Sequence, residues 1–232
     1  MTNLKSGLAL FGGTFDPIHY GHLESAKAIE KLLGASALKL VPSFLPPHRE
    51  APGTTVEQRL AMLEIAVAED EALEVDGREL VRRGVSYTVD TLDSFRAELD
   101  DMVPLYFVLG FDAYCSLHEW KHWQELTKRC HLVVLSRPGF TAEIPAEIVS
   151  WAEDKIVDEP EYLMESGCGG IIYVTLVQLD ISATQLRKHF KEGKRPTGKM
   201  PEKVIDYVIE HDLYGGRSSS LKREPSKEKA KC

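Results

Sequence analysis

Residues 8–22 read Leu-Ala-Leu-Phe-Gly-Gly-Thr-Phe-Asp-Pro-Ile-His-Tyr-Gly-His. The apolar start of this stretch predicts a buried strand, and the glycine pair after it predicts a tight turn. Glycine lets backbone N–H groups approach an anion closely, and the first turn of a following helix adds unpaired donors and the positive end of its dipole. His19 and His22 lie three residues apart, so both rings can face one bound group. The order strand, turn, paired histidines and helix predicts a site for phosphate.

A second motif lies far along the chain, where residues 181–187 read Ile-Ser-Ala-Thr-Gln-Leu-Arg. Ser182 and Gln185 fit a capping box, which predicts the start of a helix. Thr184 and Arg187 then lie on one face of its first turns. By itself the first motif is also compatible with an ordinary turn whose histidines are bonded locally. A second cluster of hydroxyls, free N–H groups and a guanidinium makes a pair of polyphosphate clamps the better interpretation.

The rest of the chain alternates between strand-like runs and helical patterns. Apolar runs predict strands at 7–11, 37–41, 73–76, 105–109, 131–135 and 171–175. Amphipathic spacing predicts helices at 22–33, 56–68, 88–99 and 201–212, the second of them opened by a Thr55–Gln58 capping box. The predicted buried stripes are Leu23, Ala26, Ile29 and Leu33 in the first helix and Leu60, Leu63 and Val67 in the second. Thr88 is the expected N-cap of the third, and Asp90 in its first turn would compete for the N–H donors there. This alternation predicts an α/β fold, a doubly wound, Rossmann-like parallel sheet in a single domain. Ligands of that fold bind at the carboxyl ends of the strands, where the candidate motifs fall.

Two stretches depart from this pattern. Residues 138–170 contain three prolines, scattered acids and a cluster of glycines, and we interpret them as an insertion or flexible loop, with a lid as one option. Residues 217–232 have almost nothing to bury, so we expect a disordered basic tail. The folded domain is therefore expected over residues 1–214.

Composition limits the classes of function. At 232 residues and 43% hydrophobic content, the chain can bury a full core. A net charge of −8 argues against nucleic acid as a partner. The tail carries six Lys or Arg and two Glu, a charge of +4, so the remaining residues carry a net charge of −12. We find no signal-peptide pattern and no run of transmembrane length, so no membrane partner is expected. The four cysteines show no CxxC and no metal-ligand spacing, which favours a reduced, cytoplasmic protein.

The two motifs together resemble the signatures of the HxGH nucleotidyltransferases. The segments between them narrow the resemblance to the bacterial nicotinate-nucleotide adenylyltransferases. These segments are Pro42 with Pro46-Pro47-His48-Arg49, Gly84 to Leu92, Tyr106 to Asp112 with Trp120, and Arg137-Pro138-Gly139. The HxGH motif is shared by several transferases, whereas the Ser-Tyr-Thr and Gly-x-Asp…Trp segments are specific to this group. The resemblance extends over nearly the whole chain, to about Tyr214.

The resemblance implies an activity and a set of site residues. ATP and nicotinate mononucleotide would be the substrates, and nicotinate adenine dinucleotide and pyrophosphate the products, in NAD biosynthesis. His19, His22 and Arg187 would be catalytic. The positions implied to bind ATP are Gly12, Gly13, Thr14, Phe15, Arg49, Gly110, Asp112, Ser182 and Thr184, and those implied to bind the mononucleotide are Ser86, Tyr87, Thr88 and Trp120. Mg²⁺ is the expected cofactor, held mainly by phosphates and water rather than by protein ligands.

Three positions depart from the family pattern. Arg49 stands where Lys is usual, Phe111 where a small residue is usual, and Ala183 where Ser is usual. None of them replaces a predicted catalytic residue, so we expect an active enzyme. Asp16 could serve as a metal ligand, but an Asp-Pro pair ahead of a helix is more typical of a turn.

Two rival hypotheses stay open. The first is transfer to another phosphorylated acceptor, such as nicotinamide mononucleotide or phosphopantetheine. The second is a non-catalytic nucleotide-sensing module, which would be expected to have lost His22 or Arg187. The sequence leaves the oligomeric state open, a homo-oligomer included.

Overall fold

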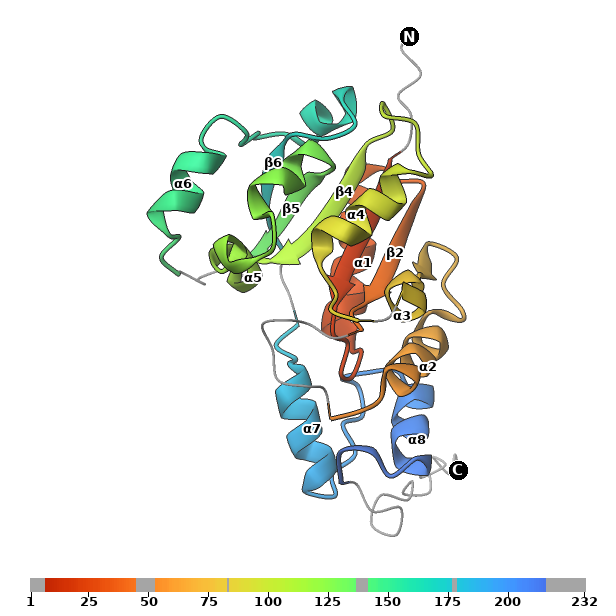
Figure 1. Cartoon of the computed structure of the whole chain (residues 1–232). Helices are drawn as coiled ribbons and strands as arrows, with labels where there is room; N and C mark the ends of the chain where they lie inside the picture. Colours follow the sequence, from red (N-terminus) through yellow and green to blue (C-terminus); the bar gives the residue numbers. More distant parts are fainter. Residues whose placement is uncertain (1–6, 45–52, 83, 137–141, 177–178, 216–232) are drawn as a thin grey trace, which may run out of the picture.

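The computed structural model describes residues 7–44, 53–82, 84–136, 142–176 and 179–215. Six parallel strands form one sheet in the order β3-β2-β1-β4-β5-β6 (Figure 1). Their bounds are β1 Leu8–Gly13, β2 Ala37–Pro42, β3 Leu73–Val75, β4 Leu105–Gly110, β5 His131–Ser136 and β6 Ile171–Thr175. The doubly wound sheet predicted from the sequence is confirmed, with every strand within about two residues of its expected bounds.

β1 lies at the point where the strand order reverses. It pairs with β2 from Leu8↔Ala37 to Gly13↔Pro42, and with β4 from Leu8↔Leu105 to Phe11↔Val108. The chain continues from β1 to β2 on one side, and after β3 it crosses to β4 on the other side, so a crevice opens beyond the carboxyl end of β1. The glycine turn of the first motif lies at this crevice.

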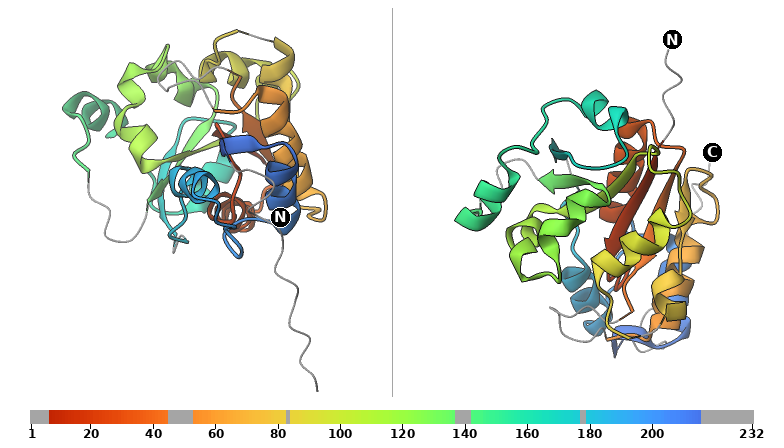
Figure 2. Two further views of the ribbon diagram at one scale, coloured as in Figure 1. Left: turned by 90° about the horizontal axis from the view of Figure 1, so that it is seen from below. Right: turned by 45° about the horizontal axis from the view of Figure 1, so that its top comes forward.

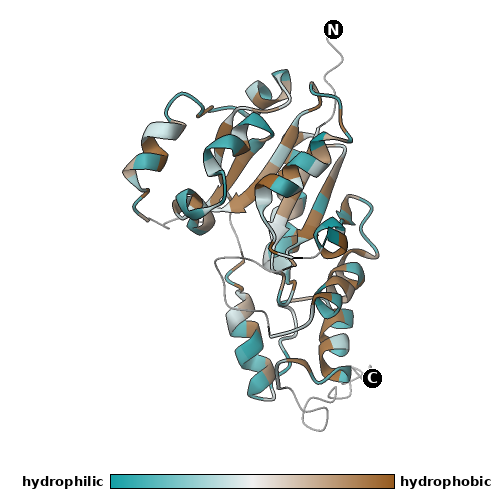
Figure 3. Cartoon of the chain, viewed as in Figure 1, coloured by the Kyte–Doolittle hydropathy of each residue, from teal (hydrophilic) through white to brown (hydrophobic). Residues whose placement is uncertain are grey.

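Both faces of the sheet are buried. Along β1, Ala9 and Phe11 pack into one hydrophobic cluster while Leu10 packs into another. This is why the strands read as continuous apolar runs rather than as alternating patterns. Figure 3 shows the strands as mostly hydrophobic and α7 (Ala183–Lys191) as largely hydrophilic.

Helices contribute to the two clusters from opposite sides. The first cluster holds residues of α1 (Tyr20–Leu33), α2 (Val56–Val67), α7 (Ala183–Lys191) and α8 (Glu202–Glu210). The second holds residues of α4 (Thr88–Arg96), α5 (Phe111–Cys115) and α6 (Ala146–Ala152). The shorter helical segments are α3 (Arg78–Arg82), η1 (Leu117–Glu119), η2 (Trp123–Lys128), η3 (Pro160–Glu165) and η4 (Leu213–Gly215).

The predicted stripe of α1 is confirmed, whereas the stripe predicted for α2 is wrong in one respect. In α1, the buried residues include the expected Leu23, Ala26, Ile29 and Leu33, and the helix ends at Gly34 in the left-handed conformation, φ 55°. In α2, the capping box at Thr55 forms as expected, but the buried face carries Arg59, Met62 and Leu63 rather than Leu60. The helix is rotated so that an arginine points inward.

The C-terminal helices lie beyond the end of the sheet toward which the strands point. Figure 1 shows α7 and α8 there, and the view from below in Figure 2 shows them over that end of the sheet. α8 packs on α2, and η4 packs on both α7 and α8. This arrangement places the start of α7 opposite the carboxyl end of β1.

The stretch interpreted as an insertion is described from residue 142 onward. It contains α6, η3 and a parallel bridge between Ile156 and Ile171. α6 contributes Ile148 and Ala152 to the second core cluster, and η3 contributes Leu163 to the first. A lid role stays a prediction. Among the described residues, no helix is long and apolar enough to cross a membrane.

Candidate active site

The carboxyl ends of β1 and β4 open into one large cleft, closed on the other side by the start of α7. The cleft has a volume of about 1330 Å³, more than the roughly 300–1,000 Å³ of a pocket for one small ligand. The predicted positions that line it are Gly12, Gly13, Thr14, Phe15, His19, His22, Ser86, Tyr87, Thr88, Gly110, Asp112, Trp120, Ser182, Thr184 and Arg187. Arg49 lies outside the described residues. Segments from five parts of the sequence therefore meet at a space large enough for two nucleotides.

The two histidines lie side by side at the mouth of α1. His19 is the N-cap residue, with φ −150° and ψ 169°, and His22 lies in the first turn. Their rings stack with centroids 3.8 Å apart and planes 22° apart. Gly21 permits this, because a Cβ there would lie 3.0 Å from the His19 ring. Both residues line the cleft, so the fold brings the two rings together there, and their contact with one bound group stays a prediction.

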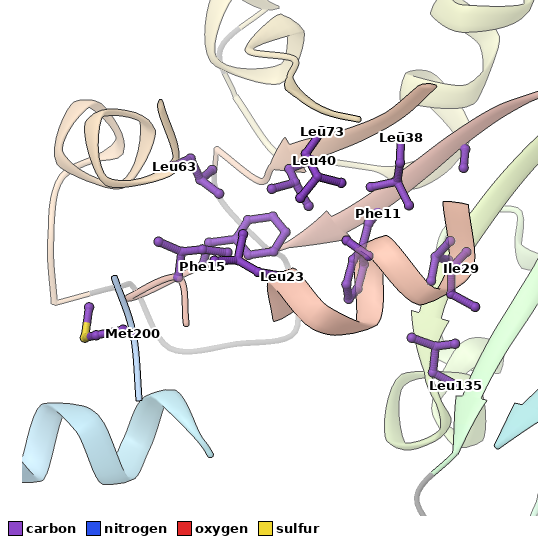
Figure 4. Close-up of a cluster of buried hydrophobic side chains, with 14 of the residues drawn as sticks. Phe11, Phe15, Leu23, Ile29, Leu38, Leu40, Leu63, Leu73, Leu135 and Met200 are labelled. Carbon is purple, nitrogen blue, oxygen red and sulfur yellow. The ribbon is translucent and has the colours of Figure 1, made fainter. Parts of the chain in front are cut away.

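Phe15 lines the cleft, and its ring is packed into the core beside it. Its side chain is only 2% exposed and belongs to the same cluster as Leu23, Leu63 and Met200 (Figure 4). Its ring also meets the ring of His22 edge to face at 5.2 Å. The ring therefore packs the loop and His22 against the core, and the role in ATP binding that the resemblance implies stays a prediction.

A buried arginine of α2 binds the backbone next to the glycine turn. Arg59 is fully buried, and its guanidinium donates to the carbonyl of Thr14 at 2.8 Å and to the carbonyl of Phe44 at 3.2 Å. Burial lowers the pKa of Arg59, and the nearby Asp16 carboxylate opposes that shift. Arg59 belongs to neither of the two sequence motifs. The available signal was an arginine at i with apolar residues at i+3 and i+4 on the inward face of a helix.

α7 presents its N-terminus to the cleft as the second motif predicts. Ser182 is the N-cap residue, and its hydroxyl accepts from the backbone N–H of Gln185 at 3.3 Å. Arg187 donates to the hydroxyl of Thr184 at 3.1 Å, so both side chains lie on one face. Arg187 also donates to the backbone carbonyl of Asp16 at 2.7 Å. The two motifs, 171 residues apart, are therefore joined directly.

The Gly110-x-Asp112 segment follows β4, where Gly110 is the N-cap residue of α5. A Cβ at Gly110 would lie 2.6 Å from Oδ1 of Asp112, so a larger residue here would displace the Asp112 carboxylate. Phe111, the unusual residue between them, lines the cleft with ring contacts to Tyr114 and Tyr173 at 6.4 and 6.5 Å between centroids. The two tyrosines, bonded hydroxyl to hydroxyl at 3.0 Å, give the larger side chain a surface on which to pack.

The Ser86–Thr88 segment forms the far end of the cleft. The hydroxyl of Ser86 accepts from the backbone N–H of Phe44 at 2.8 Å, which ties this segment to the residues after β2. The expectation that Thr88 caps the next helix is wrong. α4 begins at Thr88, and Tyr87 occupies the N-cap position in extended conformation without a side-chain capping bond. Thr88 is already helical because Val89 and Leu92 draw the first turn onto the sheet.

Trp120 lies beside this segment and packs edge to face on Phe107, with ring centroids 6.3 Å apart. Lys121, which belongs to none of the sequence motifs, also lines the cleft. Its ammonium lies 4.4 Å from the centre of the Tyr87 ring and 3.6 Å from Oδ1 of Asp90. A positive charge thus lies at the subsite expected for the pyridine ring, and it faces the acid that would compete for donors there.

Asp16 is not on the surface as an ordinary turn residue would be. It is 5% exposed, and its carboxylate accepts from the hydroxyls of Thr54 and Tyr214. The turn is present, but it is anchored in the interior. Among the described residues, no group of three or more His, Cys, Asp or Glu side chains could hold a metal ion.

Comparison with known proteins identifies the class. The family model described as cytidylyltransferase-like matches residues 10–189. Fold, cleft and family model together define a nucleotidyltransferase of this class. A probable nicotinate-nucleotide adenylyltransferase of Pseudomonas syringae pv. tomato is 43% identical over 214 residues, 92% of this chain and 96% of that protein. Another, of Pectobacterium atrosepticum, is 42% identical over 213 residues, 91% of this chain and 100% of that protein. The chain belongs to the nicotinate-nucleotide adenylyltransferase family.

Solved structures show the same fold. A nicotinic acid mononucleotide adenylyltransferase of Plasmodium falciparum, complexed with NaAD, has a TM-score of 0.69 at 18% identity and covers 92% of this chain and 99% of its own. The same enzyme complexed with APC has a TM-score of 0.68. At this identity the likeness concerns the fold alone, and it confirms the predicted nucleotidyltransferase-type sheet.

Proposed function

We propose that this chain transfers the adenylyl group of ATP to nicotinate mononucleotide and releases pyrophosphate. One observation carries the proposal within the family. The stacked pair His19 and His22, the N-terminus of α7 and Arg187 border a single cleft at the switch point of the sheet. A second subsite with an aromatic wall and a lysine lies in the same cleft. Two nucleotides bound there would have their phosphates between the two motifs.

The reaction needs alignment and charge neutralisation rather than an enzyme nucleophile. An oxygen of the mononucleotide phosphate, already ionised at neutral pH, forms a bond to the α-phosphorus of ATP. The bond from that phosphorus to the bridging oxygen breaks, and its electron pair leaves with pyrophosphate. We assign His19 and His22 to the transferring phosphoryl group, backbone N–H groups near Gly13 and Thr14 to neighbouring oxygens, and Arg187 to the β,γ end.

Mg²⁺ is proposed to enter with ATP. The donors around the cleft are imidazoles, backbone N–H groups and a guanidinium, which suit phosphate oxygens, and the buried Asp16 carboxylate is engaged by hydroxyls of the chain. We therefore assign the ion to phosphate oxygens and water, where it would neutralise charge on the leaving pyrophosphate.

The preference for nicotinate over nicotinamide follows from the part of the cleft formed by Tyr87, the start of α4 and Lys121. The free N–H groups at the start of α4 and the ammonium of Lys121 favour a carboxylate on the pyridine ring. A carboxamide brings two donors of its own to a place already rich in donors, and each unsatisfied polar group costs about 1–3 kcal/mol. Nicotinate mononucleotide should therefore exceed nicotinamide mononucleotide by at least about tenfold in kcat/KM. The Asp90 carboxylate competes for these donors only in part, because Lys121 lies beside it.

The test is pyrophosphate release by the full chain with ATP and Mg²⁺ at matched concentrations of three acceptors. These are nicotinate mononucleotide, nicotinamide mononucleotide and phosphopantetheine, and the dinucleotide product is measured by chromatography. Highest kcat/KM with nicotinate mononucleotide supports the proposal. Equal rates with the amide, or a preference for it, contradict the acceptor assignment, and a preference for phosphopantetheine supports the rival acceptor. ATP binding without turnover of any acceptor would support the sensing module.

The cytoplasmic location and the oligomeric state stay predictions. The three described cysteines, Cys115, Cys130 and Cys168, are free thiols, which supports a reduced compartment.

A further inference from the structure

A buried carboxylate joins segments that are far apart in the sequence. Oδ1 of Asp16 accepts from the hydroxyl of Thr54 at 2.5 Å and from the hydroxyl of Tyr214 at 2.6 Å. Its Oδ2 accepts from the backbone N–H of Gly53 at 3.2 Å. Asp16 is 5% exposed, so these donors replace the water that an ionised carboxyl group would otherwise bind. The first motif, the residues before α2 and the end of the described chain therefore share one polar centre.

Arg187 is attached to the same centre. One of its terminal nitrogens, Nη1, donates to the backbone carbonyl of Asp16 at 2.7 Å and lies 4.0 Å from Oδ2. The other, Nη2, donates to the hydroxyl of Thr184. These two bonds use two of the five N–H groups of the guanidinium, so donors remain for a triphosphate. The side chain is 37% exposed at the edge of the cleft. Its position is thus set by Asp16 on one side and α7 on the other.

Tyr214 is held where its hydroxyl reaches Asp16. It lies in η4 with φ 59° and ψ 19°, a left-handed conformation that residues with a side chain rarely adopt. Its ring stacks on Phe190 of α7, with centroids 5.9 Å apart. Burial and the Asp16 charge raise the pKa of Tyr214, so the phenol stays a donor at working pH. A strained backbone kept by packing at the edge of a candidate active site is typical of a functional constraint.

We propose that Tyr214 is a positioning residue for adenylyl transfer, acting through the Asp16 carboxylate to set the place of the Arg187 guanidinium. The proposal rests on the proposed function, because it assigns Arg187 to the phosphates of ATP. Without the tyrosine hydroxyl, Oδ1 of Asp16 accepts from one hydroxyl, that of Thr54, instead of two. The buried carboxylate then lacks one of the hydrogen bonds that stabilise its charge. The guanidinium, 4.0 Å from Oδ2, is a cation that can close on the carboxylate. That movement would draw it away from Thr184 and from the phosphates.

The test is Tyr214→Phe in the full chain, which removes the hydroxyl and keeps the stacked ring. Steady-state rates should show kcat/KM for ATP lowered by about tenfold, with KM for the mononucleotide changed less than about twofold. Tyr207→Phe is the matched control, since Tyr207 lies on α8 and stacks on His211 instead. It should leave both constants unchanged. An ATP constant equal to wild type in Tyr214→Phe, or an equal loss for both substrates, would overturn the proposal.

A double-mutant cycle separates positioning from a structural role. Arg187→Lys alone should raise the KM for ATP and lower kcat, each by about tenfold, because a point charge replaces the fork. In the Arg187→Lys background, Tyr214→Phe should cost less than about twofold, since the group it positions is gone. Additive losses would mean that Tyr214 acts independently of Arg187. If Tyr214→Phe fails to fold, Thr54→Val removes the other hydroxyl on Oδ1 and carries the same expectations.

A second readout does not depend on turnover. The Nε–H resonance of Arg187, assigned by its loss in Arg187→Lys, reports the order of the guanidinium in the nucleotide-free protein. Tyr214→Phe should shift and broaden this signal, and Tyr207→Phe should not. A wild-type protein inactive with every acceptor would refute the proposed function alone, and the Arg187 signal would still decide the inference. An unchanged signal in Tyr214→Phe would refute the inference whatever the activity.

Discussion

Arg59→Met should destabilise the protein and impair catalysis together, because this one side chain holds the glycine turn. Arg59 is fully buried, and it donates to the carbonyls of Thr14 and Phe44. Hydrogen bonds from a charged donor contribute about 1.5–3 kcal/mol each, so losing two removes about 3–6 kcal/mol. Met restores apolar packing of similar length and relieves the desolvation of a buried cation, which offsets part of this loss. We expect a net loss of about 2–4 kcal/mol in the free energy of unfolding.

Urea denaturation followed by circular dichroism measures this quantity, and thermal unfolding should show a fall in Tm of about 4–16 °C for a chain of this size. Arg59→Lys should be intermediate, since one ammonium cannot reach both carbonyls with the same geometry. The control is Lys203→Met, which removes an exposed ion pair with Glu69 and should cost less than about 1 kcal/mol. An Arg59→Met protein within about 0.5 kcal/mol of wild type would refute the reasoning, because the two carbonyls would then have found other donors.

Two further expectations concern histidines. His22→Ala should lower kcat by about 100–1,000-fold through loss of a transition-state donor, with the circular dichroism spectrum and ATP affinity little changed; a variant that keeps most of its turnover would exclude His22 from the mechanism. His131 is buried, its Nδ1 accepts from the Gly170 N–H at 3.0 Å and its Nε2 lies 2.9 Å from the Ser166 carbonyl oxygen. Burial lowers the pKa of His131 below 6.5, so the unfolded chain takes up this proton first as the pH falls. Stability should therefore be full above about pH 6.5 and decrease below it by up to about 1.4 kcal/mol per pH unit, and urea titrations of His131→Asn should show a shallower slope; the same slope in both proteins would assign the loss to other groups.

Local patterns in the sequence were sufficient for the elements and for the two motifs. The six strands follow from apolar runs that are buried on both faces, and the N-caps at Thr55 and Ser182 follow from capping bonds within four residues. The histidine pair and the Thr184–Arg187 pair follow from helical spacing. Each of these features depends on neighbours in the chain, and short-range geometry is the same in every context. The alternation of strands and helices then determined the parallel sheet and the edge at which ligands bind.

The contacts that hold the site residues in place depend on the tertiary structure, and no local pattern in the sequence predicts them. Which side of α2 faces inward depends on how α2 docks against the loop after β1, and this placed Arg59 rather than Leu60 in the interior. The N-cap of α4 is Tyr87 rather than Thr88, because packing on the sheet makes Thr88 the first helical residue. Asp16 meets Thr54, 38 residues away, and Tyr214, 198 residues away. A buried charge is stabilised by whatever donors the packed chain brings around it, and no local period or cap encodes which segments those are.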